Sequence, residues 1–444
     1  MNSSADIKKS HLIRGIGVIG GALLVLNGMV GSGIFALPPI VAAKAGILSP
    51  WLFLATSVLF MTVVLVFAEL SSYFRESGGP VLYATTAFGP LVGFSTGWIY
   101  YISRAVALAA NSHVMAIYLG ALWPWFGTSV GRLAVIVTII GGLTVVNVLG
   151  VKSGLRALTY FSLLKVLPLI VMIILGLQYF SPELVVPSDL PSIDDLGGTV
   201  LLLLYAFIGF ETVLITAGET EKPRSTIPRT MILTVIATGI LYFFIMLVYN
   251  LVLPGVADPD ATLVEVGRVL LGPVGVVAIT LTAIFSIGGS LSSMMLAGPR
   301  LTFALAEHKL LPNWFKRVHE RYSSPANSIM FLGGMALVIA MSGSFIQLAI
   351  ATSLARLISF IVCIAALPVI RRRADKEAIA HAYRLSGGYT IPATAFILCL
   401  WVVAQSAIDS WLIVGGLLIL GLIPYFLTQR RNRKLDATAN SQAQ

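Results

Sequence analysis

The residues best suited to bind a small molecule lie inside the first apolar stretch of the chain, in a run containing Asn27, Gly28, Gly31, Ser32, Gly33 and Ile34. Glycine and serine are poor helix formers, and non-helical backbone at membrane depth survives only where it lines a cavity or is buried in protein. Free N–H groups at the start of a resumed helix would then bind an anion such as a carboxylate. The alternative is that these glycines only allow close helix packing.

Two further features favour a break in the helix over simple packing. Pro38 and Pro39 follow the glycine run closely and predict an irregular first span. A second candidate break lies where Gly209 precedes Glu211 in a later apolar stretch, since a glycine near an ionisable residue in mid-span is typical of an interrupted helix with a working carboxylate. Two interrupted segments at corresponding positions of two halves indicate a transporter's binding site.

Three more ionisable residues fall within apolar stretches, where charge is expensive and usually functional. Arg104 is predicted either to form a structural ion pair or to contact a substrate or a gating carboxylate. Lys165, with Pro168 three residues later, is predicted either to exchange protons during transport or to stand as a fixed cation where sodium would otherwise join two helices. Glu69 lies at the end of its stretch and is predicted to pair with a basic loop.

The elements that position these residues are membrane helices. Of 444 residues, 57% are hydrophobic and only 11% charged, with a mean hydropathy of +0.93, whereas soluble domains carry about 25% charged residues. Spans need roughly 20 apolar residues. Twelve stretches are predicted to span the bilayer: 16–43, 50–74, 83–121, 131–149, 156–179, 197–218, 228–254, 271–305, 327–342, 345–370, 388–405 and 409–428.

The net charge of +10 reflects orientation. With an even number of spans both termini lie on one side, and most Lys and Arg residues fall in the loops of that side, while the opposite loops hold aspartates such as Asp189 and Asp258. This asymmetry is the positive-inside signature. A multi-pass protein of the bacterial inner membrane, surrounded by lipid and with both termini cytoplasmic, is therefore predicted, and no nucleic-acid partner. The polar tail 436–444 is predicted to be disordered.

Four stretches make the chain similar to the amino acid–polyamine–organocation family of transporters over its full length: 31–35, 207–211, 221–229 and 299–325. The resemblance implies an all-α polytopic membrane protein with 12 transmembrane helices and the LeuT-like fold, in which ten helices form a 5+5 inverted repeat and two are peripheral. The corresponding segments are a cytoplasmic N-terminal segment 1–15, the first repeat 16–179, the second repeat 197–370, peripheral spans 388–428 and a cytoplasmic tail 429–444.

The resemblance also implies that an amino acid binds at both breaks, with its carboxylate on backbone amides of the first and its ammonium group on carbonyl groups of both. The residues implied to bind or border it are Asn27, Gly28, Gly31, Ser32, Gly33, Ile34, Arg104, Tyr205, Phe207, Ile208, Gly209 and Ser353. Tyr205 or Phe207 is the candidate for an aromatic gate. The residues implied to act in coupling or gating are Lys165, which matches the lysine at the sodium position of sodium-independent members, Glu211 and Arg356.

These features predict a sodium-independent secondary transporter of amino acids that works by alternating access, with proton symport and amino acid exchange both open. The apolar residues Phe207, Ile208 and Phe210 favour a neutral substrate, while Arg104 leaves an acidic amino acid or another amine as an alternative. A channel or a solute sensor on the same scaffold is a further alternative. No enzyme, cofactor or metal is predicted, because the five histidines lack metal-ligand spacing and no nucleophile motif occurs. The oligomeric state is open.

Overall fold

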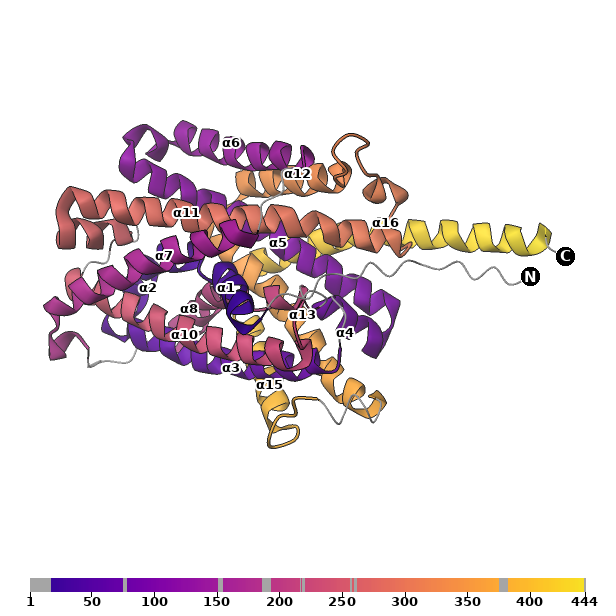
Figure 1. The fold of residues 1–444 in the computed structure, drawn as a ribbon, viewed down its shortest axis with the longest axis horizontal. Helices are drawn as coiled ribbons and strands as arrows, with labels where there is room; N and C mark the ends of the chain where they lie inside the picture. Colours follow the sequence, from indigo (N-terminus) through magenta and orange to yellow (C-terminus); the bar gives the residue numbers. More distant parts are fainter. Residues whose placement is uncertain are drawn as a thin grey trace.

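The computed structural model describes residues 17–74, 78–150, 155–185, 193–215, 217, 220–255, 258, 262–374 and 382–442; the predicted segment 1–15 and Asp189 lie outside them. The described residues form a bundle of α-helices joined by turns and short 3-10 helices, with no β-strand among them (Figure 1). The α-helices are α1 (Val18–Met29), α2 (Ser32–Ala45), α3 (Ser49–Ser72), α4 (Gly79–Phe88), α5 (Pro90–Leu122), α6 (Ser129–Val148), α7 (Leu155–Gly176), α8 (Ile193–Phe207), α9 (Thr212–Ile215), α10 (Pro223–Val252), α11 (Leu263–Glu307), α12 (Ala326–Ser342), α13 (Phe345–Arg373), α15 (Thr390–Ala404) and α16 (Ile408–Gln442).

The helices have the length and composition of membrane spans. Within the described residues, seven helical stretches are long and apolar enough to cross a bilayer, and five shorter apolar helices accompany them. Each of the apolar stretches predicted from the sequence overlaps a helix. Helices satisfy their own backbone hydrogen bonds, as the interior of a bilayer requires. The chain is therefore an all-helical, multi-pass membrane protein.

The break predicted in the first span is present. α1 ends at Met29 and α2 begins at Ser32, and the two residues between them leave helical geometry. Val30 has a ψ of 82°, and Gly31 has a φ of −124° and a ψ of −145°. Residues in an α-helix have a φ of about −60° and a ψ of about −40°. The glycine run therefore interrupts the helix, as its composition indicates.

The first span is irregular, as predicted, but at the glycine run and not at the two prolines that follow it. α2 runs through Pro38 and Pro39 to Ala45. Because proline lacks an N–H group, Pro39 leaves the carbonyl group of Phe35, four residues earlier, without its helical donor. The hydroxyl group of Tyr118 on α5 donates to that carbonyl at 2.8 Å. A neighbouring helix thus supplies the hydrogen bond that the proline removes.

The second predicted break is present as well. α8 ends at Phe207, and the short helix α9 resumes at Thr212. Gly209, between them, has a φ of +125°, a conformation that side chains disfavour and glycine adopts readily. A β-carbon added to Gly28 would lie 2.8 Å from the carbonyl oxygen of Gly209. The two interrupted segments therefore meet backbone to backbone.

Two other boundaries bear on the predicted spans. The stretch 83–121 is divided at Gly89, which has a φ of +89° and separates α4 from α5. The ninth and tenth predicted spans divide where expected, because Ser344 and Gln347 form a capping box at the start of α13. In this box, the N–H of Ser344 donates to the side chain of Gln347 at 3.0 Å.

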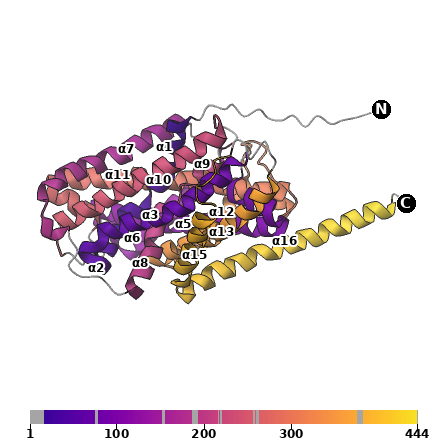
Figure 2. The same cartoon turned by 90° about the horizontal axis from the view of Figure 1, so that it is seen from below.

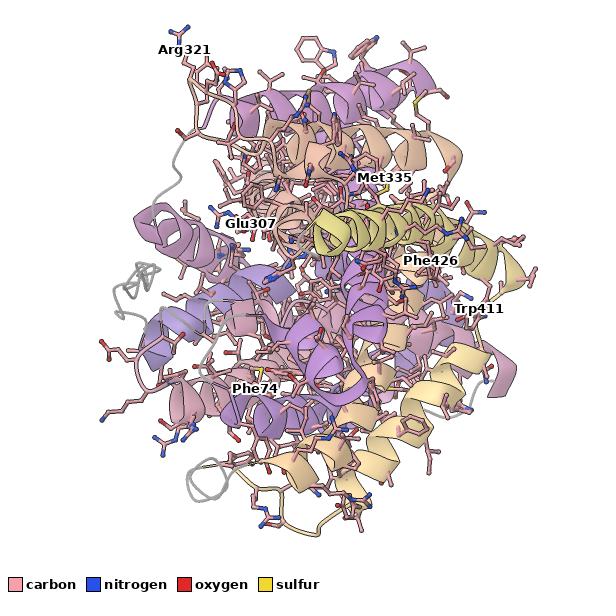
Figure 3. All side chains as sticks on the ribbon, turned by 90° about the vertical axis from the view of Figure 1, so that its right-hand side faces the viewer. Phe74, Glu307, Arg321, Met335, Trp411 and Phe426 are labelled. Atoms are coloured by element: carbon pink, nitrogen blue, oxygen red, sulfur yellow. The ribbon has the colours of Figure 1, made fainter. Side chains whose placement is uncertain are left out.

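The C-terminal helix extends far beyond the bundle at one end and diverges from it in the second view (Figures 1 and 2). α16 is helical to Gln442, so the disorder predicted for the tail is wrong for the residues described. Viewed from that end, Glu307 at the end of α11 lies beside α16 (Figure 3). Gln429 and Asn432 donate to the carbonyl of Lys309 at 3.0 and 3.1 Å.

Aromatic packing holds the second break from one side. The ring centroid of Phe210 lies 5.3 Å from Phe60, 5.5 Å from Phe67 and 5.6 Å from Phe360. Phe207 joins the same cluster, 6.0 Å from Phe60. Such aromatic pairs stabilise by about 0.5–1.5 kcal/mol beyond their burial. The cluster anchors the non-helical segment to α3 and α13.

A buried ion pair ties the end of α3 to the end of α13. Glu69 is fully buried, and its two oxygens accept from Nε and Nη2 of Arg371, each at 2.7 Å. The hydroxyl of Tyr73 and the backbone N–H of Leu385 donate to the same carboxylate at 3.1 and 3.0 Å. The prediction that Glu69 pairs with a basic group is confirmed, and its partner lies on a helix instead of a loop.

The substitution Glu69→Gln should destabilise the folded protein by about 3–5 kcal/mol, because it leaves the Arg371 guanidinium buried without a carboxylate. The measurement is thermal unfolding in detergent. Glu265→Gln is the matched control, since it removes an ion pair with Arg268 whose side chains are 41% and 56% exposed and should change stability little. Equal melting temperatures for the two variants would contradict a structural role for Glu69.

Candidate functional site

The start of α2 is a buried helix N-terminus. Its N-cap is Gly31, which offers no side chain to the first turn, and Ser32, Gly33 and Ile34 of that turn are all buried. The first N–H groups of a helix have no acceptor within the helix, and the helix dipole adds a positive potential at this end. The arrangement can bind an anionic group such as a carboxylate.

A lysine ammonium group satisfies the carbonyl groups that the first break frees. Lys165 on α7 is fully buried, and its Nζ donates to the carbonyl oxygen of Val30 at 2.9 Å and to that of Asn27 at 3.3 Å. The hydroxyl of Ser286 on α11 donates to the same Val30 oxygen at 2.7 Å. A cation thus sits among main-chain oxygens at the end of α1, where the dipole favours positive charge.

Glycines let the two breaks approach each other closely. A β-carbon on Gly33 would lie 2.8 Å from the Cα atom of Ala206, and Gly28 and Gly209 meet in the same way. Tyr242 on α10 joins the two segments, because its hydroxyl lies 3.3 Å from the carbonyl oxygen of Ala206 and 2.9 Å from that of the last residue of α1. At these three glycines a β-carbon would collide with the facing backbone, so they allow the two segments to pack closely.

A chain of polar side chains runs beside the start of α2. The hydroxyl groups of Ser32 and Tyr205 are 2.8 Å apart, and Nδ2 of Asn111 on α5 donates to Tyr205 at 3.0 Å. The ring of Tyr205 packs edge-on against Phe345, 5.8 Å away. Phe345 also lines a cavity of about 170 Å³ along α2. Tyr205 therefore contacts the break with its hydroxyl and the wall of this cavity with its ring.

The carboxylate of Glu211 is held by a cluster from α5 and α13. It lies 3.0 Å from Nη1 of Arg356, accepts from the hydroxyl of Tyr100 at 3.2 Å, and accepts from the backbone N–H of Gly209 at 3.0 Å. The Arg356 guanidinium lies over the Tyr100 ring, 3.7 Å from its centroid, and its Nε donates to Ser103 at 2.8 Å. A carboxylate this deep requires such a partner.

The predicted residues thus fall into two groups. One group meets at the breaks and consists of Asn27, Gly28, Gly31, Ser32, Gly33, Ile34, Lys165, Tyr205, Ile208, Gly209, Glu211 and Arg356. The others lie apart: Phe207 turns its ring into the aromatic cluster, which leaves Tyr205 as the gate candidate. Arg104 reaches Glu211 only through Tyr100, to whose hydroxyl it donates at 3.3 Å. Ser353 is buried on α13 one turn before Arg356.

Sequence reasoning did not assign four residues that contact the breaks or the predicted residues beside them. They are Tyr100, Asn111, Tyr242 and Ser286. A fifth, Ser290, follows Ser286 by one helical turn with two glycines between them. Serines and glycines concentrated in an apolar span are a signal that could have identified α11. The tyrosines carry no such signal, because aromatic residues are common in membrane spans.

The first break therefore offers opposite polarities to a small zwitterion. N–H groups at the start of α2 can receive a carboxylate. The side-chain oxygen of Asn27 is buried without a partner among the described residues, and it can accept from an ammonium group. A site that presents both would hold the two charges common to all free amino acids.

Comparison with known proteins identifies the family of this chain. Residues 16–420 match the amino acid permease family model. The serine/threonine exchanger SteT of Bacillus subtilis is 26% identical over 95% of this chain and 98% of its own length. The methylthioribose transporter of the same organism is 25% identical over 98% and 97%, and the branched-chain amino acid permease BcaP of Lactococcus lactis is 27% identical over 91% and 92%. The chain belongs to the amino acid permease family of membrane transporters.

Proposed function

We propose that this protein is a sodium-independent carrier of neutral amino acids that works by alternating access, either together with a proton or by exchange. The observation that carries the proposal is the position of Lys165. Its ammonium group bonds to the carbonyl oxygens of Asn27 and Val30 at 3.3 and 2.9 Å. Main-chain carbonyls at an unwound helix are the ligands with which transporters coordinate sodium. A fixed ammonium group at these oxygens takes the place of that ion.

A neutral substrate is supported by the charges around the breaks. Glu211 is already paired with Arg356 at 3.0 Å, so it offers no free negative charge to a cationic side chain. Among the relatives, SteT is named for serine and threonine and BcaP for branched-chain amino acids, all of which are neutral. The α-carboxylate would bind the start of α2, and the α-ammonium group would bind Asn27.

Alternating access is supported by the two interrupted spans. We place them as the first members of the two halves of a LeuT-like 5+5 inverted repeat, which two peripheral spans extend to twelve. The substrate would then bind at the midplane. Glu211, Arg356 and Tyr100 link the non-helical segment between α8 and α9 to α13 and α5. In this proposal the cluster closes one side of the break and opens once per cycle, which requires only two states a few kcal/mol apart.

The proposal also includes the orientation of the helix bundle in the membrane. Arg371, Arg372 and Arg373 end α13, and Nη1 of Arg373 donates to the carbonyl of Thr86 on α4 at 3.1 Å. The basic C-terminal part of α16 contacts Lys309 after α11. These contacts gather basic residues at one end of the bundle, which by the positive-inside rule is the cytoplasmic end.

An acidic amino acid is the second candidate substrate, and Arg104 is the observation that favours it. Arg104 is 7% exposed, and the structure gives its guanidinium a hydrogen bond to the hydroxyl of Tyr100 at 3.3 Å but no ion pair among the described residues. A buried cation beside a substrate site could attract a side-chain carboxylate. Uptake measurements decide between the two classes.

The proposal is tested by uptake of radiolabelled neutral, acidic and basic amino acids into proteoliposomes, with sodium replaced by choline. Uptake of neutral amino acids that a proton gradient stimulates would establish symport, and uptake only into preloaded vesicles would establish exchange. A strict requirement for sodium, or uptake restricted to acidic amino acids, would refute the proposal as stated. A flux that rises linearly with concentration would indicate a channel.

The substitution Lys165→Met should lower the initial uptake rate roughly tenfold or more. It leaves the carbonyl oxygen of Asn27 without its Lys165 donor and that of Val30 with Ser286 as its remaining side-chain donor. An unsatisfied buried carbonyl group costs about 1–3 kcal/mol. Lys44→Met, at an exposed position of α2, is the matched control and should transport normally. Wild-type rates for Lys165→Met in sodium-free buffer would show that the ammonium group is dispensable.

The substitution Gly31→Val should abolish uptake while the protein still inserts and folds. A β-carbon at Gly31 would lie 2.9 Å from Oγ of Ser290 and 3.8 Å from Oδ1 of Asn111, so the larger side chain fills the space beside the start of α2. Gly334→Val is the matched control, because nothing lies within 4 Å of its β-carbon position. Uptake is compared at equal amounts of folded protein, and normal uptake by Gly31→Val would remove the site from this break.

A further inference from the structure

Besides the side-chain oxygen of Asn27, two buried side-chain oxygens beside the first break lack hydrogen-bond partners within the described part of the protein. They are Oδ1 of Asn111 on α5 and Oγ of Ser290 on α11. Both residues are 2% exposed, so bulk water does not serve them. Buried polar groups in folded proteins are nearly always paired, and an exception calls for a specific explanation. One such explanation is a ligand that binds between α5 and α11 and pairs with both oxygens.

The two oxygens border the same space. The position of a β-carbon on Gly31 lies 2.9 Å from Oγ of Ser290 and 3.8 Å from Oδ1 of Asn111. Because Gly31 has no side chain, nothing of its own separates these groups. Gly31 also precedes the first turn of α2, where the proposed function places the substrate carboxylate. The space therefore lies within reach of a short amino acid side chain whose α-carboxylate is anchored there.

The orientation of the Asn111 amide is fixed by its neighbours. Its Nδ2 donates to the carbonyl oxygen of Ala107 at 2.7 Å and to the hydroxyl of Tyr205 at 3.0 Å. A flipped amide would place Oδ1 against the Ala107 carbonyl, and two acceptors would then repel each other. The unpaired atom of Asn111 is therefore an acceptor, whereas the hydroxyl of Ser290 can both donate and accept.

One acceptor and one hydroxyl group match a ligand group that can donate and accept at once. A substrate hydroxyl would donate to Oδ1 of Asn111 and accept from the hydroxyl of Ser290. An aliphatic side chain would leave both atoms unpaired. A carboxylate would oppose the carbonyl oxygen of Asn111, and a cationic side chain would approach the ammonium group of Lys165, which bonds to Val30 next to Gly31.

We infer that the preferred substrate carries a short hydroxyl side chain, as in serine or threonine, held between Asn111 and Ser290. The inference rests on the proposed function, since it takes the carboxylate at α2 as the anchor, and it makes Ser290 and Asn111 the residues that determine specificity. Threonine and valine test it directly, because they are nearly isosteric and differ by a hydroxyl group in place of a methyl group.

The experiment measures kcat/KM for threonine and valine in proteoliposomes containing the full-length protein. The wild type should prefer threonine by about 5- to 100-fold, the range that one unpaired buried polar group produces. Ser290→Ala and Asn111→Leu should each reduce that ratio at least about fivefold, with the loss falling on threonine. Thr56→Val is the matched control, because it also removes a buried hydroxyl without a partner, on α3, and should keep the wild-type ratio.

Each outcome separates this inference from the proposed function. Equal kcat/KM for threonine and valine in the wild type, or an unchanged ratio in Ser290→Ala, would overturn the specificity assignment while leaving amino acid transport in place. Absence of transport for every neutral amino acid would overturn both. A fall in the ratio for Thr56→Val as large as that for Ser290→Ala would show a general effect of buried hydroxyls and would also overturn the assignment.

Discussion

The structure depends on satisfying backbone polar groups where two helices stop inside a membrane. Lipid offers no hydrogen bonds, so every carbonyl and N–H freed at a break needs a partner from the protein or from a ligand. At the first break the carbonyl side is satisfied by Lys165, Ser286 and Tyr242. The N–H side, at the start of α2, is capped by no side chain at its N-cap position. Under the proposed function, a bound substrate carboxylate would accept hydrogen bonds from the N–H groups at the start of α2.

The charges in the bundle follow the same constraint. Glu69 and Glu211 are each neutralised by an arginine on α13, Arg371 and Arg356, at 2.7 and 3.0 Å. Lys165 instead meets carbonyl oxygens of α1. The two pairs have different consequences, because Glu69 joins two continuous helices whereas Glu211 belongs to a non-helical segment that ends within a few residues. Only the second pair is placed where a change in the break would separate the partners.

The two breaks could be predicted from the sequence, because a glycine run and a glycine near an ionisable residue occur at corresponding positions of two apolar stretches, a pattern typical of interrupted helices. The sequence could not show which way side chains face. Phe207 and Tyr205 are two residues apart, yet one ring enters the aromatic cluster and the other reaches Ser32, which depends on helix rotation. The partner of Glu211 was equally hidden, since Arg104 was the arginine expected to contact a gating carboxylate, whereas the packing brings Arg356 to Glu211. The sequence also could not show that α2 continues through the prolines, because Tyr118, distant in sequence, donates to the carbonyl oxygen that Pro39 leaves without its helical donor.

The contacts between helices divide into two kinds, and the division bears on how the site opens. Gly28 lies against Gly209, Gly33 against Ala206, and Gly21 against Thr230 on α10. At each of these glycines an added β-carbon would lie within 3.1 Å of an atom of the facing residue. Backbones this close resist sliding, since interiors are packed too densely to deform gradually. The links from these helices to α5, α11 and α13 include hydrogen bonds and an ion pair made by single side chains. Such bonds can be exchanged for bonds to water or substrate. If the proposed alternating-access motion occurs, it should therefore separate the helices that carry the breaks from α5, α11 and α13 and leave the paired breaks together.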